Sequence, residues 1–395
     1  KELIRRRYFL FTLHPEPFNL DDKAYAKALD EVLLSAFKGM IRNAPNVNRW
    51  IVPLSGGHDS RIVVNYLYKL GVKNVICFSY GIVENLQSRI SHQVARALNY
   101  PWYFVEYTAE KWRKMHEDML IESYFKFAYD GMATPHLQDF LAVHELKQNK
   151  IFKEGDVFVP GHLLDALAGA YLQEIDFKIS SLTDLYERAR IGLTNRPTER
   201  TYANKYKNLC NGISAKTSDL YEVLGWQERT AKFTTHSISV YRFFGYDYRL
   251  PFLDNGLIRF WQRTPKRWRL GRNSLIRAEK NGLLVNQVAA IPFAGREGKT
   301  KHKQRRKKIG KIFHPWLISS FIRFRNIKQL RGEGLNLIYE MKADTVNDLL
   351  APHEDYPPNV LKYFKYDLCR YTYQLEWSLL TTLYLMRKVI LKRTH

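Results

Sequence analysis

Cysteine is scarce in this sequence, and the three present, Cys77, Cys210 and Cys369, are far apart. Their separation matches neither a zinc site nor a disulfide framework, and it favours reduced thiols in a cytoplasmic protein. Long apolar runs are also absent, since no stretch reaches the roughly 18 consecutive apolar residues that a membrane-spanning helix requires. Residues 1–7 lack the apolar centre and cleavage site of a secretory signal. We therefore expect neither an integral membrane protein nor a secreted domain.

Acidic residues are few relative to basic ones, with 39 Asp and Glu against 62 Lys and Arg and a net charge of +23. Residues 299–331 hold 12 of the basic residues and no acidic residue, together with aromatic side chains such as Trp316 and Phe321. Such an excess predicts a polyanionic partner, either an anionic membrane surface or a nucleic acid. Nucleic acid is the weaker candidate because no RNA-binding module or zinc pattern accompanies the charge. The alternative is a solvated cationic face on packed helices.

Short apolar runs alternate with segments of helical periodicity in the first part of the chain. The predicted strands are residues 50–54, 74–81, 102–107 and 157–159, and the helices between them are residues 59–70 and 87–99. Single helices between buried strands are typical of an α/β fold with a doubly wound parallel sheet, whose ligands bind at the carboxyl ends of the strands. After the last of these strands the pattern is mostly helical.

The same pattern divides the chain into three parts. These are an N-terminal strand and helix that pack on the core, an α/β domain, and a basic helical extension, at residues 1–45, 46–300 and 301–395. In the first part, residues 8–11 are predicted to form an aromatic strand. A helix over residues 21–44 would begin at Asp21 or Asp22, because either side chain can cap it.

The strongest signal is the sequence Ser-Gly-Gly-His-Asp-Ser at residues 55–60, directly after the first predicted strand of the sheet. Two glycines let the backbone approach a ligand, and the next helix offers free N–H groups and its positive dipole end. This predicts a site for the pyrophosphate part of ATP; an ordinary strand–turn–helix corner is the alternative. No lysine closes the loop, unlike loops that serve transfer of the terminal phosphate. Asp59, on the first helical turn, is suited to hold Mg²⁺.

A second segment, residues 161–171, repeats the order of strand, small-residue turn, acid and helix. Asp165 would emerge at a strand's carboxyl end near Asp59, where the two carboxylates can share one Mg²⁺ as its protein ligands. Taken alone, Asp165 is better suited to cap a helix. The residues predicted to bind the nucleotide are Leu54, Ser55, Gly56, Gly57, Asp59, Ser60, Ser79 and Gly161.

A third segment, residues 249–254, reads Arg-Leu-Pro-Phe-Leu-Asp. Pro251 fixes a turn, and Asp254 is predicted to cap a helix over residues 255–262. Arg249 is expected to brace the wall of the site. This segment therefore has a structural role in the predicted site.

In this order and at these separations, the three segments resemble the synthetase domain of the asparagine synthetase family, within the pyrophosphate-loop ATP pyrophosphatase superfamily. The resemblance spans roughly residues 5–300 and depends on residues 55–60 and 249–254 and on Gly161, Asp165, Leu167, Gly169 and Tyr171. It implies the fold of that superfamily and an activity that uses ATP with Mg²⁺. A substrate carboxylate would attack ATP to give an acyl-adenylate and pyrophosphate. Ammonia or an amine would then displace AMP and form an amide.

Two positions depart from the family in the second segment. His162 stands where the family keeps a glutamate, and Ala166 stands where it keeps another acid, which counts against free aspartate as substrate. His162 could accept the proton of the attacking amine, since its unperturbed pKa lies near neutrality, or it could only hydrogen-bond substrate or backbone. The family also implies a catalytic lysine on a late loop. We assign it to Lys299, with Lys301 and Arg296 as alternatives.

The family's glutamine-hydrolysing domain has no counterpart here, since too few residues precede the loop and none of them is cysteine. Nitrogen is therefore expected from free ammonia, a separate glutaminase or another amine. The presence of a further segment upstream is left open, because the sequence begins with Lys1 rather than Met.

Residues 226–233 and 241–247 resemble stand-alone asparagine-synthetase-like proteins of bacterial surface-polysaccharide biosynthesis, such as O-antigen assembly. The leading hypothesis is therefore a carbon–nitrogen ligase, an amidotransferase that acts on a sugar (uronic) acid. It would be cytoplasmic, with residues 299–331 binding it peripherally to the inner membrane. The alternatives are asparagine synthetase or a related amide- or lactam-forming cyclase, an RNA-modifying adenylase, and a binding protein without catalytic activity. Retention of both Asp59 and Asp165 opposes the last.

Overall fold

The computed structural model describes residues 9–14, 19–81, 84–128, 135–189, 210, 213 and 215–294. At its centre is a five-stranded sheet of order β3-β2-β1-β4-β5, and all four strand pairings are parallel. The strands are β1 (Trp50–Pro53), β2 (Val75–Gly81), β3 (Trp102–Glu106), β4 (Val157–Phe158) and β5 (Asp247–Tyr248). The predicted α/β fold with a parallel sheet is confirmed.

The chain builds this sheet outward from β1 in two directions. β1, α2 (Asp59–Lys69), β2, α3 (Leu86–Ala97) and β3 follow one another toward one edge, and β4 then pairs with β1 on the other side. The strand order therefore reverses between β1 and β4. A reversal of this kind opens a crevice at the carboxyl ends of the two strands, which is where open α/β sheets bind ligands. Both predicted acid-bearing segments directly follow these two strands.

The strand residues alternate between two apolar cores, one on each face of the sheet. Trp50 and Val52 belong to one core and Ile51 to the other. Since both faces are covered, the strands read as continuous apolar runs rather than as alternating ones. The first core also contains residues of α1 (Asp22–Arg42), α2, α3, α12 (Asn255–Arg263) and α14 (Asn273–Ala278). The second contains residues of α4 (Ala109–Glu117), α5 (Leu120–Ala128), α6 (Phe140–Gln148) and α11 (Ser239–Phe243).

In the N-terminal part, the predicted helix is confirmed and the predicted strand is not. Helix α1 begins after Asp21, whose carboxylate accepts the Ala24 N–H at 2.7 Å, and it packs against α2, α12 and α14. The predicted strand over residues 8–11 is wrong for its described residues 9–11, which belong to no strand. Phe11 is buried instead by stacking on Trp226, with ring centroids 4.8 Å apart, so aromatic packing replaces backbone pairing. The domain boundaries stay predictions, and residues 301–395 lie outside the described residues.

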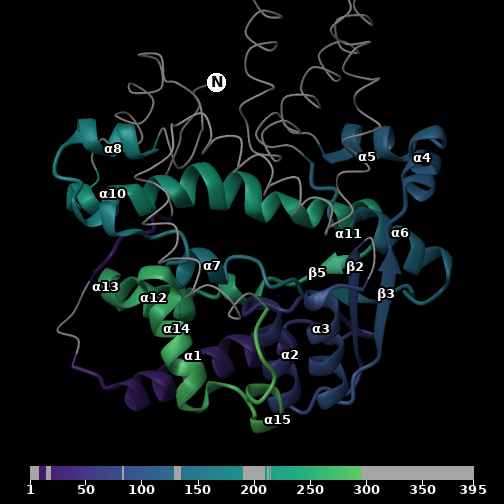
Figure 1. Cartoon of the computed structure of the whole chain (residues 1–395), viewed down its shortest axis with the longest axis horizontal. Coiled ribbons are helices and arrows are strands. Elements are labelled where there is room, and N and C mark those ends of the chain that lie inside the picture. The colour runs from purple at the N-terminus through teal and green to yellow at the C-terminus, as the bar shows by residue number, and fades with distance from the viewer. Residues whose placement is uncertain are drawn as a thin grey trace, which may run out of the picture.

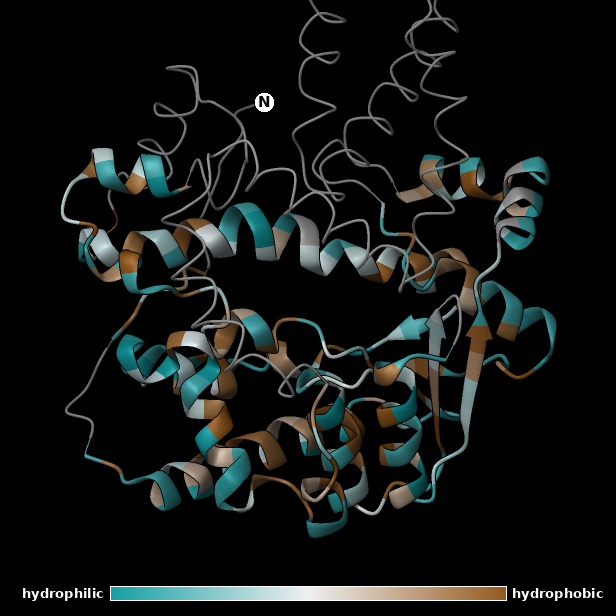
Figure 2. Ribbon diagram, viewed as in Figure 1, coloured by the Kyte–Doolittle hydropathy of each residue, from teal (hydrophilic) through white to brown (hydrophobic). Residues whose placement is uncertain are grey.

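A continuous helical rod crosses the molecule beyond the carboxyl ends of the strands (Figure 1). It consists of α10 (Thr217–Leu224), η3 (Gly225–Thr234), η4 (Thr235–Ile238) and α11. Its central part, η3, is a π-helix of 10 residues, and Figure 2 shows hydrophilic residues there between more apolar ends. π-Helical turns are rare and occur frequently at functional sites. The rod therefore presents a polar, irregular middle to the edge where ligands are expected.

The remaining elements are short and connect these layers. They are α7 (Leu164–Leu167), η1 (Glu174–Phe177), α8 (Leu182–Ala189), η5 (Pro251–Leu253), α13 (Lys266–Arg269), η6 (Leu270–Arg272), η7 (Glu279–Leu283) and α15 (Asn286–Ala289). Helices α8 and α10 share a small third core. Among the described helices, none combines the length and the apolar character that crossing a bilayer requires.

Candidate active site at the carboxyl edge of the sheet

The loop after β1 is folded by its own two serines. The Ser55 N–H donates to Ser60 Oγ at 3.0 Å, and the two hydroxyl oxygens lie 3.2 Å apart. The Gly57 N–H in turn donates to Ser55 Oγ at 3.3 Å. Helix α2 starts after His58, whose side chain makes no capping hydrogen bond. The first N–H groups of α2 are thus left without a side-chain cap, as an anion-binding helix terminus requires.

The last described segment of the chain is fixed against this loop. The Ala294 N–H donates to Gly56 O at 3.0 Å, and a Cβ on Gly56 would come within 2.8 Å of Ala294 Cβ. The buried Arg61 guanidinium donates to Ile291 O at 2.6 Å and lies 3.8 Å from the centre of the Phe293 ring. The predicted Lys299 and its alternatives Lys301 and Arg296 follow this segment and lie outside the described residues.

His58 completes this contact between the loop and the later part of the chain. Its Nδ1 lies 2.8 Å from a carboxylate oxygen of Glu279, and its ring stacks on Phe293 at 4.1 Å between centroids. The His58 side chain therefore faces Glu279 of η7 and the segment that contains Phe293. His58 is a positioning residue for the loop.

The turn after β4 lies directly against the start of α2, and only glycine fits there. A Cβ on Gly161 would lie 2.7 Å from the Ser60 nitrogen and 2.8 Å from the Asp59 carbonyl carbon. The turn continues through Leu163, which adopts a left-handed conformation with φ of 85°, into the four-residue helix α7. Gly161 thus brings the second acid-bearing turn onto the first.

The two predicted acids meet at this contact, and a cation lies beside them. Arg272 forms an ion pair with Asp165, and its guanidinium is 4.0 Å from Asp59. Burial and the negative charge of Asp165 hold the pKa of Asp59 well above its ordinary value, while Arg272 opposes that shift. The side chains of Asp59 and Asp165 are 21% and 30% exposed, so both remain open to a ligand from solvent. The structure thus places one cation and two acids in a single cluster.

Arg272 was not among the site residues predicted from the sequence, and a chain of close contacts brings it to the acids. Gly169 has φ of 78°, and a Cβ there would lie 2.5 Å from Arg269 O. Its own carbonyl accepts the Gly271 N–H at 3.1 Å. Arg272 itself has a left-handed conformation, with φ of 67°. One signal in the sequence could have identified Arg272. Gly271 and Arg272 directly precede the helical periodicity of α14, and a glycine at such a place indicates a sharp turn, here followed by a basic residue.

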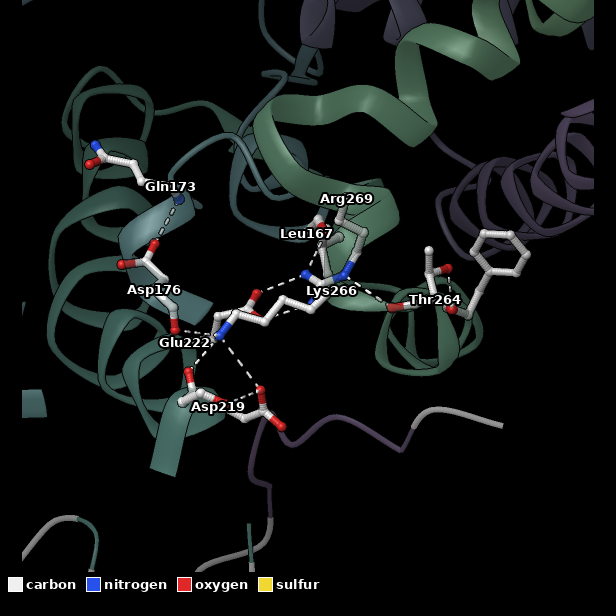
Figure 3. Close-up of polar contacts among 10 residues, drawn as sticks. Leu167, Gln173, Asp176, Asp219, Glu222, Thr264, Lys266 and Arg269 are labelled. Atoms are coloured by element: carbon white, nitrogen blue, oxygen red, sulfur yellow. Dashed lines mark hydrogen bonds and ion pairs between the residues drawn. The ribbon is translucent and has the colours of Figure 1, made fainter. Parts of the chain in front are cut away.

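A buried polar cluster fixes the base of this turn (Figure 3). The Arg269 guanidinium is fully buried and donates to both carboxylate oxygens of Glu222, at 2.7 and 2.8 Å. It also donates to Leu167 O at 3.3 Å and to Thr264 O at 3.2 Å. One side chain therefore joins the rod, the turn after β4 and the end of α12. Bidentate pairs of this kind combine strength with a defined geometry.

The acid pair suits Mg²⁺, which proteins commonly bind through one or two carboxylates together with substrate phosphates. Burial, and then the charge of Asp165, raise the pKa of Asp59, so a bound cation would stabilise the two carboxylates, and Arg272 in part has this role. No group of three or more His, Cys, Asp or Glu suited to a metal is present among the described residues. Two carboxylates are too few to hold a metal by themselves. The site therefore fits a metal that also binds the phosphates of a nucleotide better than a metal bound by protein side chains alone.

Two of the predicted nucleotide-binding residues have side chains that are engaged elsewhere. Leu54 is in the core, 2% exposed. The Ser79 hydroxyl donates to Leu54 O and lies 2.7 Å from Ser91 Oγ, in a buried position at the end of β2. Any contact of Leu54 with a nucleotide would thus be through its backbone, and Ser79 joins β1 to β2. Their predicted role in binding stays a prediction.

His162 lies in a group of histidines beside the rod. Its Nδ1 is 3.1 Å from Ser237 Oγ, and burial lowers the pKa of His162 to about 4. Burial and the neighbouring His162 and His236 lower the pKa of His136 to about 3. His162 is therefore neutral at pH 7 and weakly basic, which favours the hydrogen-bonding alternative over proton acceptance.

The third segment has the predicted structural role. The Asp254 carboxylate accepts the Leu257 N–H at 3.1 Å, which confirms it as the cap of α12. The Arg249 guanidinium forms an ion pair with Asp247 at 2.6 Å, and the backbone N–H of Arg249 donates to Phe158 O at the end of β4. It thus braces β4 and β5 rather than contacting the acid pair.

Comparison with known proteins gives limited information. No family model and no curated protein matches the sequence. Solved structures that align with it include a U34-tRNA thiolase from Methanococcus maripaludis (57% of this chain, 79% of that one), an NH3-dependent NAD synthetase from Campylobacter jejuni (64% and 96%) and an NMN synthetase from Francisella tularensis (62% and 98%). Each is 12% identical with a TM-score of 0.25. Similarity this low identifies no family, and the residues at the junction of β1 and β4 remain the basis for assigning a function.

Proposed function

We propose that the protein is an ATP-dependent, AMP-forming amide synthetase, which adenylates a substrate carboxylate and transfers ammonia or an amine to it. One observation carries the proposal: Asp59, Asp165 and Arg272 form a single charged cluster beside the uncapped start of α2. The cluster lies where the strand order reverses, at the expected ligand position. The resemblance of residues 55–60, 161–171 and 249–254 to the asparagine synthetase family supports the same reaction.

Each group has a defined task in this reaction. The N–H groups of residues 56–60 bind the β- and γ-phosphates, which leave together as pyrophosphate. Asp59 and Asp165 would hold Mg²⁺, and the charge of the metal would offset that of the pyrophosphate. Arg272 binds the same phosphates, since a guanidinium matches phosphate geometry. Lys299, on the segment that follows Ala294, stabilises charge at the acyl phosphate as the bond to AMP forms and breaks.

We propose a sugar (uronic) acid as the carboxylate substrate. Residues 226–233 and 241–247 support this through their resemblance to proteins of surface-polysaccharide biosynthesis, and a neutral His162 in place of an acid supports it because a sugar hydroxyl can donate to it. Free ammonia or a separate glutaminase would supply nitrogen. An anionic membrane surface bound by residues 299–331, and a cytoplasmic location peripheral to the inner membrane, belong to the same proposal and concern residues outside those described.

Product analysis tests the reaction class. The protein is incubated with ATP, Mg²⁺, ammonia and a panel of uronic acids, and nucleotides are separated at intervals. We expect AMP and pyrophosphate with the correct acid, and an acid-dependent exchange of labelled pyrophosphate into ATP when ammonia is left out. ADP and phosphate as the main products would contradict the proposal.

Variants of the acid pair connect this reaction to the site. Asp59→Asn and Asp165→Asn should each lower AMP formation by at least roughly 10²–10³-fold, the effect of losing an electrostatic contact in the transition state. The double variant should be hardly worse, because residues that act as a unit are not additive. Asp22→Asn is the control: Asp22 forms only a surface ion pair with Arg277, and its loss should leave turnover unchanged.

A further inference from the structure

A pocket lies between the turn after β4 and the π-helical part of the rod. Its walls include Ala166, Gly169 and Tyr171 from the turn and Trp226, Arg229 and Thr230 from η3. The cavity volume is about 40 Å³. Since a single water requires roughly 10–15 Å³, this space suits one small polar group rather than a whole ligand.

The pocket contains a cation whose charge is not neutralised. The Arg229 guanidinium lies 3.5 Å from the centroid of the Tyr171 ring, and no acidic side chain of the described chain pairs with it. Glu222 also lines the pocket, but both of its oxygens are bound to Arg269 (Figure 3). By contrast Lys232, on the same element, is paired with Glu228 at 2.7 Å. Arg229 is thus available to an anion that enters the pocket.

A buried donor in the same wall also lacks an acceptor. Trp226 is 9% exposed, and its Nε1 finds no hydrogen-bond partner in the part of the chain that the structure describes. A buried N–H without a partner is costly, and this cost would be recovered by an acceptor bound in the pocket. The charge of Arg229 indicates that the missing group is an oxyanion, and the indole N–H would be a second donor to it.

The pocket connects with the acid pair through Tyr171. Burial raises the pKa of the Tyr171 hydroxyl, and the charges of Asp165 and Asp59 raise it further, so this side chain is within electrostatic range of both acids. Ala166, in the wall of the pocket, directly follows Asp165 in the chain. A group held by Arg229 therefore belongs to a ligand that also reaches the reaction centre.

We propose that this pocket binds a second oxyanion, a phosphate or a further carboxylate, carried by the same acid whose carboxylate is adenylated. The inference rests on the proposed function and narrows its substrate class to acids with at least two anionic groups. Arg229 and Trp226 are then specificity-determining residues, because they bind the substrate away from the bonds that form and break.

Binding without ATP tests the pocket. Titration calorimetry at fixed ionic strength compares glucuronic acid with glucuronic acid 1-phosphate and with glucaric acid. We expect at least one dianionic sugar to bind about tenfold or more tightly than glucuronic acid, the usual contribution of a charged hydrogen bond. Preference for the first assigns a phosphate to the pocket, and preference for the second assigns a carboxylate.

Variants test whether the preference for a dianionic sugar depends on the residues of the pocket. Arg229→Gln should abolish it, and Trp226→Phe, which removes the indole N–H with the five-membered ring but keeps an aromatic ring beside Phe11, should reduce it. Arg267→Gln is the matched control, because the Arg267 guanidinium lies 4.1 Å from the Phe177 ring but pairs with Glu174 on the exposed surface. Equal affinities for the three sugars would overturn the proposal. So would a preference that survives Arg229→Gln but is lost in Arg272→Gln, since the anion would then lie at the phosphate site.

Failure of this inference can be told apart from failure of the proposed reaction. An Arg229-dependent preference supports the pocket even if no acid yields AMP, a result that would count against the amide synthetase alone. If the preferred dianionic acid is adenylated with the same kcat/KM by wild type and Arg229→Gln, the pocket is overturned and the reaction class stands.

Discussion

The turn after β1 and the turn after β4 have the same plan, with a small-residue corner that leads to an acid on a helix, yet they are built for different tasks. The first opens an 11-residue helix whose initial N–H groups have no side-chain cap. The second opens a helix of only four residues behind a left-handed Leu163. A helix this short has little dipole and few free N–H groups. The first turn can thus hold phosphate through its backbone, whereas the second contributes a carboxylate.

The two turns also depend on different supports. The first is tied by its own serines and by the segment at residues 291–294. The second depends on distant residues, since Gly169 packs against Arg269, and the turn that follows Arg269 brings Arg272 to Asp165. Similar local sequences can therefore have different functions, according to what the rest of the chain packs around them. Substitutions at the contact between the two turns should therefore affect both the stability of the fold and the position of the two acids.

The largest effect should come from filling the contact between the turns. In Gly161→Ala the new Cβ would meet the backbone of Asp59 and Ser60 at under 3 Å. Overpacking typically costs about 1–3 kcal/mol, and here it would also displace Asp59 from Asp165. We expect a lower denaturation midpoint together with loss of AMP formation.

Gly39→Ala is the matched control for this change. Gly39 lies inside α1 with nothing within 4 Å of its added Cβ. Alanine is favoured over glycine in a helix by roughly 1 kcal/mol, so this variant should be as stable as wild type or more so. A Gly161→Ala protein with unchanged midpoint and turnover would show that the two turns are not in contact.

A smaller effect, confined to acid pH, is expected from His162 on the second turn. Its pKa falls from 6.5 to about 4 on folding, so between these values the unfolded chain binds more protons than the folded one. The stability contributed by neutral His162 is complete above pH 6.5 and is lost as pH falls toward 4. His162→Gln should flatten the fall in urea midpoint over this range, leaving the part due to His136. A pH profile identical to that of wild type would place His162 in solvent.

Much of the fold was predictable because its signals are local. Residues 50–54 and 74–81 are apolar on both faces, and the helices between strands have clear periodicity, so the parallel sheet followed directly. The caps Asp21 and Asp254 were predictable for the same reason, since a cap concerns one turn of chain. The proximity of Asp59 and Asp165 followed from topology. The carboxyl ends of neighbouring parallel strands lie at the same edge of a sheet, so the residues that come directly after those strands lie close together.

The rest depends on contacts between distant residues. Arg272 lies more than 100 residues from Asp165, and only the packing of Gly169 on Arg269 brings it to the acids. The aromatic run at 9–11 has strand-like composition, but Phe11 packs on Trp226 and Leu10 on the third core, while Phe9 is exposed. Nor did periodicity reveal that η3 is π-helical over its 10 residues. Lys299 lies outside the described residues and remains a prediction.

The most direct test of a single shared site is the thermal stability of four proteins without ligand: wild type, Asp59→Asn, Asp165→Asn and the double variant. Because the raised pKa of Asp59 reflects burial and repulsion from Asp165, each single variant should melt higher than wild type at pH 7. The gain should vanish below the unfolded carboxyl pKa of about 3.9. The double variant should gain less than the sum, since Arg272 then loses both partners. Strictly additive shifts at pH 7 would contradict the account and place the two acids in separate sites.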